Sequence, residues 1–187
     1  MDLLFVTGNK NKLKEASQIL GFEVKGIEVD VPEIQDIEVD NIIEYKARKA
    51  YEEVKRPIII EDTGLYFESM NGFPGALIKW VLKSVGNKGI VKILKNMGHR
   101  KAYAKTSIGY FDGDEFRIFS GIIKGEICEE PRGENGFGWD MIFQPEGYDK
   151  TFAEMTNEEK NDISMRKIAF EKTREFLFKL DKEVGSL

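Results

Sequence analysis

The segment TGNKNK at residues 7–12 has the residue types that a phosphate-binding turn requires, and it directly follows a short apolar run. Thr7 and Asn9 carry side chains that form hydrogen bonds, Gly8 lets a ligand approach the backbone closely, and Lys10 and Lys12 supply positive charge. The glycine spacings of a P-loop and of a dinucleotide site are both absent. The segment therefore predicts a phosphate site of another kind. The alternative is an ordinary capped turn between a strand and a helix.

Two groups of carboxylates are candidates to face this turn. Asp62 directly follows three isoleucines, where a carboxylate is poorly solvated unless it meets a metal ion or a hydrogen-bond donor. Glu61 adjoins it, and Glu33 lies in an acidic loop. Carboxylates opposite a lysine-rich turn indicate a divalent cation that joins them to a polyphosphate, because without the cation they would repel it. The alternative for Asp62 is a turn residue bonded to the amides of Thr63 and Gly64.

A glycine-rich loop, GENGFGWDMIF at residues 133–143, carries two aromatic residues. Phe137 and Trp139, beside the polar Asp140, suit a platform on which a nucleobase stacks. The alternative is that both aromatic residues anchor the loop in the core. Further along the chain, Lys160 and Arg166 lie at the entrance of the last predicted helix, where they would either bind a base edge or form surface ion pairs.

The composition limits the classes of partner and metal ion. The chain has 187 residues and a formal net charge of −5, which argues against binding a nucleic-acid polymer and favours free nucleotides. Cys128 is the one cysteine and His99 the one histidine, so neither an intramolecular disulfide nor a cysteine-rich zinc cluster can form. Any metal ion is therefore expected to be Mg²⁺ or Mn²⁺, held by carboxylates and water. We interpret His99 as a solvated loop residue.

The N-terminus lacks the basic start and apolar stretch of a signal peptide. No apolar run approaches the ~20 residues of a membrane span. These features predict a cytoplasmic protein that does not associate with membranes.

The order of elements in the first third of the chain predicts an α/β sheet. Apolar runs indicate strands at 3–6, 22–27 and 58–60, and helical spacing indicates helices over 13–20 and 43–54, the second capped by Asp40 or Asn41. Ligands of such sheets bind beyond the carboxyl ends of the strands, where residues 7–12 and 62–63 would meet.

The rest of the chain adds a turn and longer strands. We expect a turn at 72–75, a helix around 90–97, two long strands at 103–111 and 115–128 joined at a tight turn, a short strand at 141–143 and a last helix over 163–180. Residues 1–187 would form one domain with a mixed sheet, flanking helices and two lobes enclosing a central substrate cleft.

With these groups in order, the chain resembles the inosine triphosphate pyrophosphatase family. The matching segments are FVTGNKNKLKEA, VPEIQ, IIIEDTGLYF, GFPGALIKW, PRGENGFGWDMIFQPEGYDKTFAEM and EEKNDISMRKIA, which run in order from Phe5 to Ala169. The resemblance implies hydrolysis of ITP, dITP and XTP to the monophosphate and pyrophosphate. It also implies Mg²⁺, with Mn²⁺ as a substitute, and a homodimer with an elongated α/β fold.

The resemblance also implies roles for individual residues. Glu33 and Asp62 would bind the metal ion, and Asp62 would be the general base, a role that the sequence leaves open between Asp62 and Glu61. Met165 stands where many members carry a histidine, and Lys10 falls at an open position of the family pattern, where it gives electrostatic help. The implied substrate contacts are Thr7, Gly8, Asn9, Lys10, Asn11, Lys12, Thr63, Phe137, Gly138, Trp139, Asp140, Lys160, Met165 and Arg166.

The expected reaction is attack of a water molecule on the α-phosphorus, with pyrophosphate leaving. A guanidinium at Arg166 would select the six-keto oxygen of hypoxanthine or xanthine over the amino group of adenine. Two alternatives remain from the sequence: a nucleotide sensor that does not hydrolyse its ligand, and a pyrophosphatase of the septum-inhibitor type that acts on other modified nucleotides.

Overall fold

The computed structural model describes residues 3–184, except for the side chains of Asn11, Glu183 and Val184. The strands are β1 (Leu4–Val6), β2 (Lys25–Ile27), β3 (Ile58–Phe67), β4 (Pro74–Gly75), β5 (Lys101–Phe111), β6 (Phe116–Ile127) and β7 (Phe143–Pro145). The α-helices are α1 (Lys10–Leu20), α2 (Val39–Val54), α3 (Ile78–Leu94), α4 (Asn157–Ile163) and α5 (Met165–Val184), and two short 3₁₀ turns are η1 (Glu68–Met70) and η2 (Phe152–Glu154).

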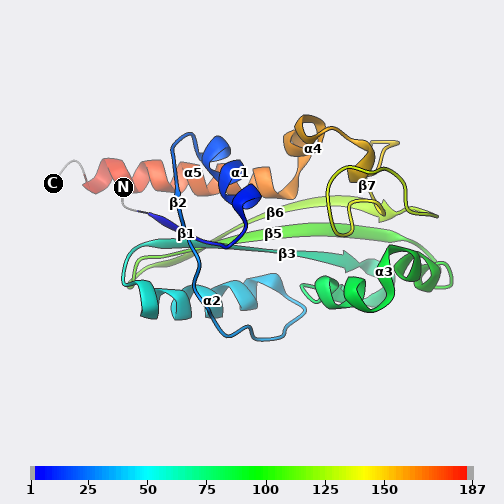
Figure 1. Cartoon of the computed structure of the whole chain (residues 1–187), viewed down its shortest axis with the longest axis horizontal. Helices are drawn as coiled ribbons and strands as arrows, with labels where there is room; N and C mark the ends of the chain where they lie inside the picture. Colours follow the sequence, from blue (N-terminus) through cyan, green and yellow to red (C-terminus); the bar gives the residue numbers. More distant parts are fainter. Residues whose placement is uncertain (1–2, 185–187) are drawn as a thin grey trace.

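The strands form one seven-stranded mixed sheet in the order β2-β1-β3-β5-β6-β7, with β4 paired to β3 outside this path. Figure 1 shows an elongated molecule in which α1 and α5 cover one face of the sheet and α2 and α3 the other. The predicted α/β class with a mixed sheet is confirmed. None of the helices within residues 3–184 is long and apolar enough to cross a membrane.

The first strands alternate their side chains between two cores, because successive residues of a strand point to opposite faces. Phe5 and Ile59 pack in the core beneath α1 and α5. Leu4, Ile58 and Ile60 pack in the core beneath α2. The strands predicted at 3–6 and 58–60 are therefore confirmed and are buried on both faces, whereas the strand predicted at 22–27 is shortened to β2 and is mostly exposed.

A third core lies at the other end of the sheet. It contains the last residues of β3, the inner face of α3 and the aromatic residues Trp139, Phe143 and Phe152. The sheet is continuous between the two ends, and the helical cover changes from α2 to α3 along it (Figure 1).

Strand β3 is longer than predicted, because it continues past residue 60 to Phe67. It pairs antiparallel with β5 along its whole length, from Ile58 opposite Phe111 to Phe67 opposite Ala102. Strand β1 is much shorter and ends at Val6, opposite Ile60. Asp62 therefore lies in the middle of a strand, at the point where the neighbouring strand stops, rather than in a turn.

Other boundaries differ from the predictions for local reasons. Neither Asp40 nor Asn41 caps α2, whose N-cap is Glu38 without a side-chain bond; the Asp40 carboxylate instead accepts hydrogen bonds from Lys105 and Ser107 on β5. The short strand predicted at 141–143 is shifted to β7. The last helix is preceded by the separate α4, and α3 begins earlier than predicted and has a non-helical residue, Gly86, with φ of 67°.

The β5–β6 hairpin turn is organised by Asp112. One of its oxygens, Oδ1, accepts the backbone N–H groups of Asp114 and Glu115 at 3.0 and 2.8 Å, and Oδ2 accepts the Tyr110 hydroxyl at 3.2 Å. Burial raises the pKa of the Asp112 carboxyl, but these hydrogen bonds outweigh it and lower the pKa below its ordinary value of 3.8.

Asp112→Ala is expected to lower the free energy of unfolding by about 1 kcal/mol at neutral pH, because three donors lose their acceptor. A carboxyl with a lowered pKa in the folded state stabilises fully above its unfolded pKa, and this stabilisation is lost as pH falls through the folded pKa. Urea unfolding at pH 7 and at steps below pH 4 should show the difference from wild type shrinking. The exposed Asp114, changed to Ala, serves as the control, and a difference that stays constant with pH would contradict the assignment.

Candidate active site

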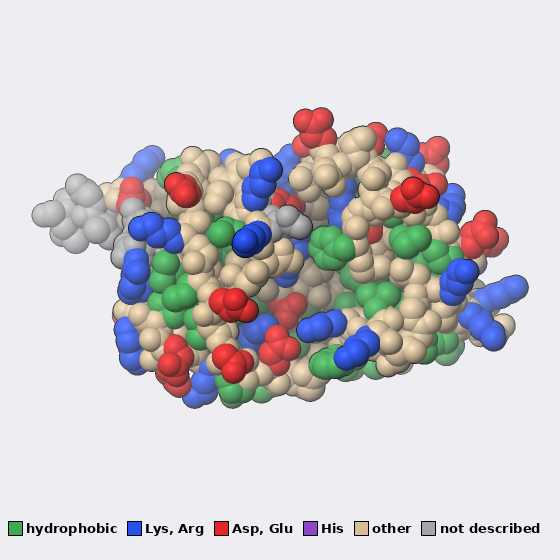
Figure 2. Space-filling model, in the orientation of Figure 1, with side chains coloured by type: hydrophobic (Ala, Val, Ile, Leu, Met, Phe, Trp, Pro, Cys, Tyr) green, Lys and Arg blue, Asp and Glu red, His purple; other side chains and the backbone are tan. Residues whose placement is uncertain are grey.

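A cleft of about 710 Å³ lies where β1 ends beside β3. Its walls come from the turn after β1, the loop of residues 28–35, the inner face of α2, the middle of β3 and the start of α3. Figure 2 shows a hollow near the middle of this side of the molecule, with acidic and basic side chains at its rim. The predicted site residues among its lining are Thr7, Gly8, Asn9, Lys12, Glu33, Asp62 and Thr63.

The turn after β1 is held by its own side chains. The Thr7 hydroxyl oxygen accepts the N–H of Asn9 at 3.1 Å, and Asn9 Oδ1 accepts the N–H of Lys12 at 3.3 Å. This is the capped turn that the sequence allowed as an alternative. The same turn also lines the cleft, so the capped turn and a phosphate site do not exclude each other. Lys10 is exposed and is not among the lining residues, and the side chain of Asn11 lies outside the described residues.

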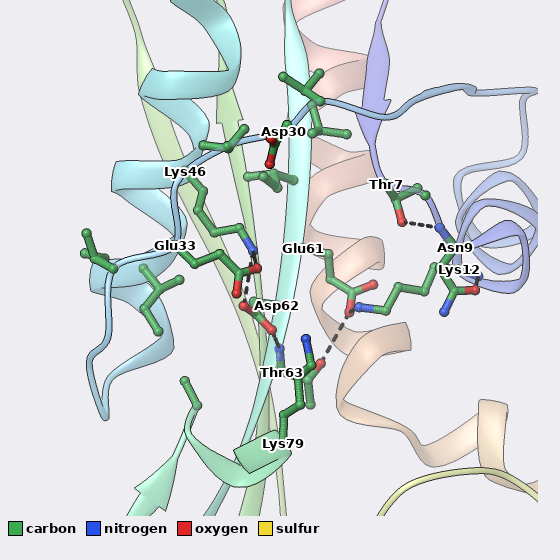
Figure 3. A pocket seen from close by; sticks show the side chains of 18 of the residues that line it. Thr7, Asn9, Lys12, Asp30, Glu33, Lys46, Glu61, Asp62, Thr63 and Lys79 are labelled. Atoms are coloured by element: carbon green, nitrogen blue, oxygen red, sulfur yellow. Dashed lines mark hydrogen bonds and ion pairs between the residues drawn. The ribbon is translucent and has the colours of Figure 1, made fainter. Parts of the chain in front are cut away.

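Two carboxylates converge on one ammonium group on the other side of β3. Lys46 Nζ lies 2.9 Å from Glu33 Oε1 and 3.6 Å from Asp62 Oδ2. Figure 3 shows these three side chains gathered opposite Thr7, Asn9 and Lys12. The hydrogen bond and charge of Lys46 lower the pKa of the Glu33 carboxyl, so Glu33 is ionised at neutral pH.

This pair has the donor chemistry of a magnesium site. Glu33 and Asp62 offer hard oxygen ligands, their side chains are 49% and 31% exposed, and a cationic group already lies between them. Within residues 3–184 no cluster of three or more acidic, histidine or cysteine side chains has metal-binding geometry. Mg²⁺ commonly binds proteins through one or two carboxylates and completes its shell with water and substrate phosphate, so two carboxylates fit this ion.

Glu61 is fully buried and pairs with cations from two helices. Its Oε1 lies 3.2 Å from Lys12 Nζ, and its two oxygens accept Arg166 Nε and Nη2 at 3.1 and 3.2 Å. Burial alone would raise the pKa of the Glu61 carboxyl, but Arg166 and Lys12 outweigh it and lower the pKa to about 2. Both oxygens of Glu61 are bound to these cations inside the fold, whereas the Asp62 side chain is 31% exposed, which leaves Asp62 as the better candidate base.

Phe137, Asp140 and Lys160, three of the residues predicted at the base end, form a second group outside the cleft lining. Asp140 Oδ2 accepts the N–H of Phe137 at 2.8 Å and Lys160 Nζ at 2.6 Å. The Lys160 ammonium also lies 5.1 Å from the centre of the Phe137 ring, whose residue is 63% exposed. The carbonyl of Gly138 accepts Asn87 Nδ2 at 2.9 Å, which ties the loop to α3.

Trp139 and Met165 are core residues. Both belong to the third core, where the Trp139 ring packs edge-on against Phe143 with centroids 5.6 Å apart. Of the two interpretations of the aromatic loop, Trp139 therefore follows the core-anchor alternative, and Phe137 keeps an exposed face suitable for stacking. Arg166, adjacent to Met165, is 7% exposed and joins this end of the molecule to Glu61.

Sequence reasoning missed several residues of the cleft, among them Lys46, Lys79 and Trp80. Lys46 had a detectable signal, because it lies four residues after Ile42 and one before Ala47, on the buried face of an amphipathic helix. Lys79 and Trp80 lie at the start of α3, where the sequence prediction had placed no helix. Figure 3 shows Lys79 reaching into the cleft near Thr63.

Comparisons with known proteins place the chain among nucleotide hydrolases. The model of the Ham1 family matches residues 3–176. A dITP/XTP pyrophosphatase of Methanopyrus kandleri is 46% identical over 180 residues, which cover 94% of this chain and 96% of that protein. An inosine triphosphate pyrophosphatase of Schizosaccharomyces pombe is 45% identical over 179 residues, 94% of each chain. A HAM1 protein structure from Coxiella burnetii has a TM-score of 0.83 at 29% identity and covers 95% of this chain and 98% of that one.

The two aromatic residues of the loop should behave differently when truncated. Trp139→Ala is expected to lower the free energy of unfolding by about 3–5 kcal/mol, because it opens a cavity in a core. Phe137→Ala should change it by less than about 0.5 kcal/mol, since an exposed ring leaves no cavity. Urea unfolding of both variants measures this, and equal losses would contradict the placement of the two rings.

Proposed function

This chain belongs to the Ham1 family, and we propose on that premise that it hydrolyses ITP, dITP and XTP to the nucleoside monophosphate and pyrophosphate. Such an enzyme removes deaminated purine nucleotides from the nucleotide pool. The observation that carries the proposal is the cleft in which a phosphate-type turn with Lys12 lies opposite the carboxylate pair of Glu33 and Asp62. Of the two relatives named above, one is named as a dITP/XTP pyrophosphatase and the other as an inosine triphosphate pyrophosphatase.

The triphosphate is proposed to lie along the turn after β1. The Thr7 hydroxyl keeps its own hydrogen to donate, and the amides at the start of α1 favour an anion. Lys12, Lys46 and Lys79 line the same cleft and supply three positive charges against the phosphates. A larger residue at position 8 would have to displace Glu28, because a Cβ atom there would lie 2.9 Å from Glu28 Oε1.

Glu33 and Asp62 are the proposed ligands of Mg²⁺, or of Mn²⁺ as a substitute. When bound, such an ion offsets the charge of the triphosphate and of the leaving pyrophosphate. Asp62 is the proposed general base: its Oδ1 accepts the N–H of Thr63 at 2.8 Å, which orients the carboxylate, and its other oxygen faces the cleft with Lys46. From there Asp62 takes the proton of the water that attacks the α-phosphorus.

The base is proposed to bind at the group formed by Phe137, Asp140 and Lys160, with Arg166 selecting the six-keto oxygen. Three donor atoms of Arg166 are bound to Glu61 and Glu15. A guanidinium has five N–H groups, so two remain for a base. In this proposal residues 1–187 act as one two-lobed domain, and the chain works as a cytoplasmic homodimer.

Product analysis tests the reaction directly. With Mg²⁺ present, ITP, dITP and XTP are expected to yield pyrophosphate and the monophosphate, ATP is expected to react far more slowly, and EDTA should abolish turnover. Chromatography of products from these nucleotides, with GTP in parallel, checks this. Release of orthophosphate and a diphosphate would mean that the γ-phosphorus is attacked, and the placement of Asp62 would be wrong.

Replacement of the base should affect turnover far more than binding. Asp62→Asn is expected to lower kcat for ITP by about 10²–10⁴, the usual contribution of a general base, while binding of ITP changes by less than about tenfold. Asp30→Asn is the matched control, because Asp30 lines the same cleft without a proposed role. Pre-steady-state pyrophosphate release and ITP titration measure the two effects. A near wild-type kcat for Asp62→Asn would exclude Asp62 as the base.

A further inference from the structure

One carboxylate joins the two ends of the proposed substrate site. Glu61 Oε1 is shared by Lys12 Nζ at 3.2 Å, Arg166 Nη2 at 3.2 Å and the Thr63 hydroxyl at 3.3 Å, while Oε2 accepts Arg166 Nε at 3.1 Å. The side chain of Glu61 is fully buried, so water does not compete for these oxygens. Lys12 belongs to the phosphate wall and Arg166 to the base end.

The two cations come from the first turns of different helices. Lys12 lies in the first turn of α1, and Arg166 is the second residue of α5. Arg166 also binds α1 through Glu15, at 2.9 Å from Nη1. A movement of the Lys12 ammonium would therefore shift the Glu61 carboxylate, which also binds the Arg166 guanidinium.

We propose that Glu61 is a positioning residue that couples base selectivity to the phosphate-binding Lys12, an inference that rests on the proposed function. Lys12 and Thr63 help to fix the plane of the Glu61 carboxylate, and that plane sets the direction of the Arg166 guanidinium. Selection of a six-keto base depends on that direction, because hydrogen bonds weaken steeply as their angle closes.

This role differs from mere stabilisation of the fold. Buried ion pairs add little net stability, since the cost of removing the charges from water offsets their attraction. A positioned guanidinium is sensitive to small displacements, and a misplacement of about 1 Å in an active site costs about 10²-fold in rate. The contribution of Glu61 should therefore appear in selectivity as well as in stability.

The test compares two lysines of the cleft. ITP and ATP carry the same triphosphate, so a lysine that only binds phosphate affects both nucleotides equally. Lys12→Met is expected to lower the ratio of kcat/KM for ITP to kcat/KM for ATP by about tenfold, because the Glu61 carboxylate loses one of its donors. Lys46→Met is the matched control: it pairs with Glu33 and Asp62 instead, and should lower both activities while the ratio stays within about twofold.

The variant Glu61→Gln tests whether the effect of Lys12 on selectivity passes through Glu61. In Glu61→Gln the ratio should already be lowered, and adding Lys12→Met should not lower it further. An unchanged ratio in Lys12→Met, or an equal fall in Lys46→Met, would overturn the proposal. If Glu61→Gln does not fold, the comparison of Lys12→Met with Lys46→Met still tests the proposal, because neither lysine belongs to a hydrophobic core. A wild-type protein that releases no pyrophosphate from ITP would instead overturn the proposed function.

Discussion

A carboxylate in the middle of a buried strand loses the hydration that stabilises its charge, and Glu61 on β3 is in this position. Its charge is retained because Lys12 and Arg166 supply compensating charges and hydrogen bonds. Each of these long side chains must come from a helix that begins close to the strand. The placement of the first turns of α1 and α5 over the centre of the sheet is therefore tied to the burial of this one group.

The neighbouring Asp62 has the opposite environment because a strand alternates its faces. Glu61 points to the face covered by α1 and α5, and Asp62 points to the face of α2, where Lys46 and Glu33 lie. Two adjacent acidic residues thus pair with different cations, Glu61 with Lys12 and Arg166 and Asp62 with Lys46. Strand β1 ends one position before them, so both border the same cleft.

Patterns in short segments predicted the elements whose conformation depends on residues close together in the sequence. The strand-helix-strand order and the hairpin at 112–113 followed from short segments, and so did the turn after β1, although α1 begins at Lys10 and shortens that turn to residues 7–9. The length of β3 did not, because its second half is stabilised by pairing with β5, about 40 residues away. The partner of Glu61 in α5 is 105 residues away in the chain, and no local signal marks such a pair. The ambiguity at Trp139 had the same origin, since its partners in the core are set by tertiary packing.

The glycine-rich loop that carries Phe137 packs on the third core, whereas the residues of β3 just before Asp62 pack in the two other cores. Trp139 anchors the loop in the core at one end of the molecule, and Asn87 of α3 ties it down from outside. Strand β1 and the first residues of β3 are supported at the other end by α2, α1 and α5. A change in the shape of the loop around the exposed Phe137 should therefore disturb Glu33 and Asp62 little. The part of the chain proposed to contact the base is thus anchored separately from the part proposed to carry out the hydrolysis.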